Sequence, residues 1–146
     1  MANATEEEVM LRLIYGAKGS GKTGKLIELA DQAMKNCDGE VVFLTDTDRY
    51  RFKVNYNIRL INVCEYDVEN ADELIGLVRG IIAGNADVQH VFIDGVHRMT
   101  GQDFEHLEPF FVKLKKVSRD HDVTMVLTIS NDELPAYLAD CEYIKA

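Results

Sequence analysis

The chain has 146 residues, of which 47% are hydrophobic, so it is long and apolar enough to form a buried core and is not a disordered chain. We predict a single domain over residues 1–146. The formal net charge is −9, from 25 acidic and 16 basic residues. A surface of this sign repels the phosphate backbone of nucleic acids, so it argues against nucleic-acid binding.

The cysteines and the N-terminal residues indicate in which cellular compartment the protein lies. The three cysteines, Cys37, Cys64 and Cys141, form no C-x-x-C pair, so neither a zinc site nor a redox motif is predicted. Residues 1–8 are acidic and contain no apolar signal segment, and no apolar run is long enough to span a bilayer. We therefore expect a cytoplasmic protein that does not insert into a membrane and keeps its cysteines reduced.

The first predicted strand, Val9–Tyr15, leads into a glycine-rich segment that is followed by a helix ending near Asn36. The segment reads GAKGSGKT and matches G-x-x-x-x-G-K-[ST], the P-loop or Walker A motif. A strand before the motif and a helix after it are the context in which it binds phosphate. We predict that a nucleoside triphosphate is bound by Gly16, Ala17, Lys18, Gly19, Ser20, Gly21, Lys22 and Thr23.

The residue types of this segment suit a phosphate ligand. Glycines at positions 16, 19 and 21 allow positive φ angles and a close approach of the backbone to a ligand. Successive backbone N–H groups then point into one concavity, and the following helix adds the positive end of its dipole. Lys22 is placed to reach the β- and γ-phosphates, and the Thr23 hydroxyl to bind a Mg²⁺ ion that bridges them.

The second strand is predicted over Glu40–Thr45, an apolar run typical of a strand buried on both faces of a parallel sheet. Asp46 and Asp48 follow it, where they either position water or Mg²⁺ or act as polar caps of the strand. Asp46 is therefore a candidate catalytic residue. The alternating basic and aromatic side chains of Arg49–Lys53 suit a site for nucleobases or single strands, an exposed loop, or a contact with a partner.

Strands and helices alternate along the rest of the chain. We predict, in order, a strand over Ile58–Val63, a helix over Ala71–Gly84, a strand over Val88–Ile93, a long helix from about Gly101, a strand over Val123–Ile129, a helical turn over Pro135–Ala139 and a strand over Cys141–Ile144. This alternation predicts an α/β fold, a three-layer αβα sandwich with a mainly parallel sheet. Ligands of such sheets bind at the carboxyl ends of the strands, where Asp46, Asp94 and Ser130 should join the glycine-rich segment.

Asp94 follows the apolar strand Val88–Ile93, as the aspartate of a Walker B motif does. A carboxylate there accepts a hydrogen bond from Thr23 or from water bound to Mg²⁺, although an aspartate is also an ordinary strand end or helix cap. We predict that Thr23 and Asp94 hold Mg²⁺ and that Lys22, Asp94 and Asp46 are the catalytic residues.

Several further residues have both a functional and a structural interpretation. Ser130 and Asn131 follow the strand that ends at Ile129 and either sense a γ-phosphate or form a turn. His97 either approaches the nucleotide or is structural. Arg98 and Arg119 are candidates for an arginine finger supplied within the chain or by a neighbouring subunit.

With Gly16–Thr23 and Asp94 in this arrangement, the chain resembles the P-loop NTPase superfamily, and within it the RecA-like and thymidine-kinase-like branch. The resemblance implies the P-loop NTPase fold, with ATP and Mg²⁺ as ligands. It also implies that the strand before Gly16 lies centrally in the sheet. One further strand should separate it from the strand that ends before Asp94.

The sequence also departs from this branch. Many hydrolysing members carry a glutamate directly after the Walker B aspartate, but this chain has Gly95. The zinc-binding cysteines and long substrate loop of a thymidine kinase are missing from it as well. We therefore expect a small ATP-binding protein, either a slow Mg²⁺-dependent ATPase or a nucleotide switch, which works with a protein partner or as a homo-oligomer. The alternatives are a nucleoside or small-metabolite kinase and a degenerate P-loop domain that serves as an interaction module.

Overall fold

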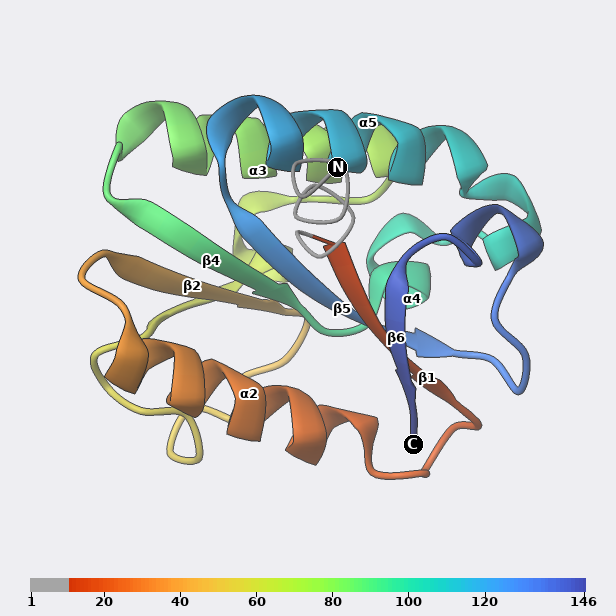
Figure 1. The fold of residues 1–146 in the computed structure, drawn as a ribbon, viewed down its shortest axis with the longest axis horizontal. Coiled ribbons are helices and arrows are strands. Elements are labelled where there is room, and N and C mark those ends of the chain that lie inside the picture. The colour runs from red at the N-terminus through yellow and green to blue at the C-terminus, as the bar shows by residue number, and fades with distance from the viewer. Residues whose placement is uncertain (1–10) are drawn as a thin grey trace, which may run out of the picture.

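The computed structural model describes residues 11–146, which form a six-stranded sheet whose neighbouring strands all run parallel (Figure 1). The strands are β1 (Leu11–Gly16), β2 (Glu40–Thr45), β3 (Arg59–Asn62), β4 (Val88–Ile93), β5 (Thr124–Ser130) and β6 (Glu142–Lys145). Their order across the sheet is β3-β2-β4-β5-β1-β6. The predicted first strand, Val9–Tyr15, begins outside the described residues, and β1 confirms the part that lies within them.

Helices cover both faces of this sheet (Figure 1). α2 (Lys22–Asn36) lies on one face, and α3 (Ala71–Gly84), α4 (Val96–Thr100) and α5 (Glu108–His121) lie on the other. Short 3₁₀ turns cover Val63–Tyr66, Phe104–His106 and Ala136–Leu138. This arrangement confirms the predicted α/β class and its parallel sheet. No helix within residues 11–146 is both long and apolar enough to cross a membrane.

Alternating side chains of the same strands contribute to two cores. On the α2 face, Phe43 of β2 stacks on Phe92 of β4 with ring centroids 6.4 Å apart, and both belong to a buried cluster with Leu26 of α2. On the other face, the next residues along the two strands, Leu44 and Ile93, belong to the cluster that includes α3 and α5. Burial on both faces explains why these strands are nearly continuous apolar runs in the sequence.

The prediction of a long helix from about Gly101 is wrong at its start, and the short helix α4 lies before Gly101, where no helix was predicted. α4 ends at Thr100 and is capped by Gly101, whose φ of 67° lies in the left-handed region that favours glycine. α5 begins only at Glu108, and Pro109 fits its first turn because a proline there loses no intrahelical hydrogen bond. The apolar residues Phe104 and Leu107 are buried in the connection between α4 and α5.

The strand order brings the carboxyl ends of β1, β4 and β5 together. β5 lies between β1 and β4, which is the placement that the resemblance implies, whereas β1 is not central but next to the edge strand β6. Gly16 at the end of β1 is opposite Ser130 of β5, and Ile93 at the end of β4 is opposite Leu127 of β5. The segments that follow these strands therefore start close to one another.

Candidate functional site

The loop between β1 and α2 contains glycines for two different physical reasons. φ is +82° at Gly19 and +90° at Gly21, so both lie in the left-handed region that other residues avoid. We expected a positive φ at Gly16 too, but it is not among the residues with positive φ. Instead, a Cβ at Gly16 would lie 2.7 Å from Oγ of Ser20 and 3.2 Å from Cβ of Ala146. Gly16 is therefore required by close packing, and Gly19 and Gly21 by the turn.

The loop ends at the N-terminus of α2, where backbone N–H groups lack acceptors within the helix. The capping residue, Gly21, has no side chain to accept a hydrogen bond from them, and the first turn of α2 contains no acidic residue. The positive end of the helix dipole is thus not balanced within its own first turn. A phosphate group placed here would accept hydrogen bonds from these N–H groups and interact favourably with the dipole.

Lys22, the first residue of α2, places an ammonium group inside the loop. Its Nζ donates a hydrogen bond to the carbonyl oxygen of Ala17 at 2.8 Å, and only 7% of the residue is exposed. Burial lowers the pKa of Lys22, an effect that the nearby Asp94 carboxylate opposes and the Arg98 guanidinium adds to. An anionic ligand in the loop would offset this burial penalty by stabilising the charged form.

Asp94, which directly follows β4, is hydrogen-bonded to the first turn of α2. Its carboxylate accepts hydrogen bonds from the Thr23 hydroxyl, at 3.0 Å to Oδ2 and 3.2 Å to Oδ1, although the two residues are 71 positions apart in the sequence. Asp94 is only 2% exposed. A buried carboxylate needs such partners, because an unpaired one is costly in an apolar environment. The structure thus brings together the two residues that we predicted to hold Mg²⁺.

Thr128 of β5 is a further residue of this site, which sequence reasoning missed. Its hydroxyl donates to Oδ1 of Asp94 at 2.7 Å and accepts a hydrogen bond from the backbone N–H of Gly95 at 3.1 Å. The register places Leu127 opposite Ile93, so Thr128 and Asp94 follow at the same level of neighbouring strands. A hydroxyl within the otherwise apolar stretch from Met125 to Ile129 was the available sequence signal.

Arg98 of α4 forms an ion pair that the sequence did not predict. Its Nε lies 2.7 Å from Oδ2 of Asp46 and its Nη2 lies 3.2 Å from Oδ1, so the guanidinium faces the carboxylate with two donors. The same Nη2 lies 3.9 Å from Oδ2 of Asp94. Gly95 makes room for this side chain, because a Cβ there would overlap the Arg98 guanidinium. A glutamate at position 95 is therefore incompatible with the observed position of Arg98.

Several of these groups line one cavity of about 360 Å³ at the carboxyl ends of the strands. Its walls include Lys18, Gly19, Gly21, Lys22 and Thr23 of the loop, together with Asp94, Arg98 and Ser130. Arg49 and Tyr50, from the segment after β2, close it on another side. Asp46 is not part of the lining, and its carboxylate is connected to the cavity through Arg98. The predicted catalytic role of Asp46 thus has no direct counterpart in the geometry of the cavity.

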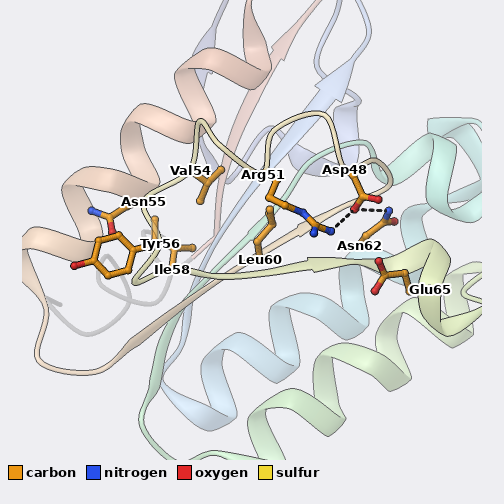
Figure 2. A pocket seen from close by; sticks show the side chains of 9 residues that line it. All are labelled: Asp48, Arg51, Val54, Asn55, Tyr56, Ile58, Leu60, Asn62 and Glu65. Atoms are coloured by element: carbon orange, nitrogen blue, oxygen red, sulfur yellow. Dashed lines mark hydrogen bonds and ion pairs between the residues drawn. The ribbon is translucent and has the colours of Figure 1, made fainter.

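A second cavity, of about 270 Å³, lies between the segment that follows β2 and strand β3 (Figure 2). Asp48 lines this cavity and not the first one, so it is not placed to position water or Mg²⁺ beside Asp94. Figure 2 shows Arg51 directed toward Asp48. Nη2 of Arg51 donates to Oδ1 of Asp48 at 3.1 Å, and the Asn62 amide donates to the same oxygen at 3.3 Å. The apolar side chains of this cavity come from Val54, Ile58 and Leu60.

Of the predicted phosphate-binding segment, Gly16, Ala17 and Ser20 lie outside the lining of the first cavity, and so do three of the other candidates. His97 packs against Phe104 with ring centroids 5.8 Å apart, and burial lowers the pKa of this histidine, which favours the structural interpretation. Asn131 forms a turn, since its side-chain amide donates to the carbonyl oxygen of Glu133 at 2.8 Å. Arg119 is exposed near the end of α5. Of the two candidate arginine fingers, only Arg98 lines the cavity.

No protein-family model matches the sequence, and no curated protein matches it either. Within residues 11–146, no group of three or more His, Cys, Asp and Glu side chains could hold a metal ion. The geometry around the first cavity is therefore the basis for inferring a function.

Replacing Gly95 by alanine is expected to lower the free energy of unfolding by about 2 kcal/mol or more, because a strained φ of this kind costs about 1–3 kcal/mol and the new methyl group displaces Arg98. The residue has a φ of +94°. Urea unfolding followed by circular dichroism measures the change. Gly101→Ala is the matched control, because Gly101 also has a positive φ but has no atom within 4 Å of an added Cβ. Equal losses in the two variants would contradict the steric role of Gly95.

Proposed function

We propose that this protein binds ATP with Mg²⁺ as a P-loop NTPase and acts as a nucleotide switch or a slow ATPase. The observation that supports this most directly is the 3.0 Å contact between the Thr23 hydroxyl and the Asp94 carboxylate. Both residues line the cavity that Lys22 also lines. A loop rich in backbone donors, one ammonium group and a hydroxyl–carboxylate pair form the set of groups that a metal-bound triphosphate requires.

The hydroxyl and carboxylate of this contact fit Mg²⁺, which prefers oxygen ligands. Mg²⁺ sites in nucleotide-binding proteins use few protein ligands, because waters and phosphate oxygens supply the others. This use agrees with the lack of a larger His, Cys, Asp and Glu cluster within the described part of the chain. Thr23 and Asp94 would hold the ion, either directly or through water. Bound Mg²⁺ would neutralise charge on the phosphates.

The carboxylates near the cavity support slow turnover. Asp94 is the one acidic side chain among the described residues that line the cavity, and Thr23 and Thr128 already donate to it. Asp46 is paired with Arg98. In hydrolysing enzymes of this class a side chain orients the attacking water, and Gly95 cannot do so. A long-lived ATP state is what a switch needs.

Thermal unfolding tests the proposal. A ligand that binds only the folded state at 100 times its Kd should stabilise it by about 2.7 kcal/mol, which raises Tm by several degrees for a chain of this size. We expect this shift with ATP and Mg²⁺, and a Mg²⁺-dependent phosphate-release assay across nucleotides should show slow turnover. If ATP and GTP with Mg²⁺ raise Tm no more than inorganic phosphate does, the proposal is wrong.

A nucleoside or small-metabolite kinase is the second candidate, and the cavity beside β3 favours it (Figure 2). Its rim carries the polar side chains of Asn55, Asn62 and Glu65, and its apolar side chains suit a flat ring. The segment after β2 contributes to both cavities, with Arg49 and Tyr50 in one and Asp48 and Arg51 in the other. Release of ADP that rises when a nucleoside is added would favour this second candidate over the first.

A further inference from the structure

Arg98 is a cation of the cavity whose present partner is more accessible to exchange than that of Lys22. Its side chain is 45% exposed, and its main partner, Asp46, has an 18% exposed side chain. Water reaches the Arg98 side of this pair and screens it, so a more highly charged acceptor can compete with the Asp46 carboxylate. Lys22, in contrast, is buried and is held by the carbonyl oxygen of Ala17.

The guanidinium lies beside the place where the end of a phosphate chain would lie. Arg98 lines the cavity together with Lys22 and Thr23, and its Nη2 is 3.9 Å from the Asp94 carboxylate, which is one of the two proposed Mg²⁺ ligands. The γ-phosphate is the group that Mg²⁺ and the loop lysine share in this class of site. A planar guanidinium with several N–H donors binds phosphate oxygens in pairs, as it binds the two oxygens of Asp46 here.

A phosphate group could therefore replace Asp46 as the acceptor of the hydrogen bonds from Arg98. A guanidinium stays protonated in proteins whatever its partner, so Arg98 keeps its charge throughout the exchange. Asp94 already accepts hydrogen bonds from Thr23 and Thr128, at 3.0 and 2.7 Å, and is one of the two proposed Mg²⁺ ligands. A phosphate at the end of the cavity would be the strongest competing acceptor for the Arg98 donors.

We propose that Arg98 exchanges Asp46 for the terminal phosphate of a bound nucleoside triphosphate and so distinguishes a triphosphate from a diphosphate. This inference rests on the proposed function of the same cavity. A diphosphate lacks the γ-phosphate, so Arg98 stays on Asp46 when it binds. Asp46 is then a restraint on Arg98 and not a catalytic residue. When Arg98 leaves, Asp46 loses its ion pair at the start of the segment after β2. This segment carries the exposed aromatic residues Phe52 and Tyr56.

The test compares the Kd values of ADP and a non-hydrolysable ATP analogue, both with Mg²⁺, by calorimetry. Arg98→Gln is expected to weaken binding of the ATP analogue about tenfold, the size of a charge-assisted hydrogen bond to phosphate, and to leave ADP binding unchanged. Asp46→Asn is expected to change the ratio in the opposite direction, because the competing charge is removed. Arg79→Gln, the same change at an exposed position of α3, should leave both Kd values unchanged.

The outcomes separate this inference from the function on which it rests. If the wild-type chain binds neither nucleotide, the proposed function fails. If it binds both nucleotides and Arg98→Gln weakens them equally or not at all, only the role of Arg98 fails. A measurement on the unaltered chain covers the case in which a variant does not fold. The NMR resonance of Arg98 Nε–Hε should shift when the ATP analogue is added and not when ADP is added, and equal shifts would overturn the inference.

Discussion

Replacing Lys22 by alanine is expected to weaken ATP binding about 100-fold, because the variant loses the ammonium group that pairs with the phosphates in the cavity. The wild-type side chain is 7% exposed, and its Nζ lies 2.8 Å from the carbonyl oxygen of Ala17, within the loop that would surround the phosphates. Removing a buried charge also removes the burial penalty that lowers the pKa of Lys22. We therefore expect the folded state to remain stable while its affinity for ATP falls.

Calorimetric titration with ATP and Mg²⁺ measures the affinity, and urea unfolding shows whether the variant is folded. Lys25→Ala is the matched control, because Lys25 lies one turn further along the same helix and does not line the cavity. It should bind ATP as the wild type does. Equal affinities in the wild type and in Lys22→Ala would place the phosphate site elsewhere.

The parts of the fold and site that the sequence predicted well depend on local patterns. Apolar runs predicted β2, β5 and the Val91–Ile93 end of β4, because these stretches are buried on both faces. The glycine-rich segment predicted a loop between a strand and a helix, and α2 begins at Lys22 within it. The position of Asp94 directly after β4 predicted that it lies close to Thr23, because the carboxyl ends of parallel strands lie at the same edge of the sheet.

The features that sequence reasoning missed depend on contacts between distant segments. The pair of Arg98 and Asp46 joins residues 52 positions apart, and nothing in either local sequence specifies it. Thr128 acquires its partner from the register between β4 and β5, which could not be read before the strand order was known. The start of the long helix was predicted wrongly although local signals were present. Gly101 caps α4 and Pro109 lies in the first turn of α5, but the apolar residues Phe104 and Leu107 between them also have a helical spacing.

Replacing Asp94 by asparagine is expected to remove the dependence of ATP affinity on Mg²⁺, because a neutral amide is a poor substitute for a carboxylate near a divalent cation. The wild type should bind ATP at least about tenfold more tightly with Mg²⁺ than with a chelator, and the variant should show little difference. The variant keeps the shape of the side chain and an oxygen acceptor, so at least one of the hydrogen bonds from Thr23 and Thr128 can be retained. We therefore expect it to fold, with a lower free energy of unfolding.

Titrations with and without Mg²⁺ measure this dependence, and Asp87→Asn is the matched control. Asp87 directly precedes β4 at its amino end, whereas Asp94 directly follows the strand at its carboxyl end, so the same chemical change is made at opposite ends of one strand. The Asp87 side chain is not among those lining the cavity, and its backbone carbonyl, which accepts a hydrogen bond from Glu40, is unchanged by the substitution. Asp87→Asn should keep the full effect of Mg²⁺. If Asp94→Asn keeps it too, this carboxylate does not hold the ion, and the contact between Thr23 and Asp94 serves only to fix α2 to the end of β4.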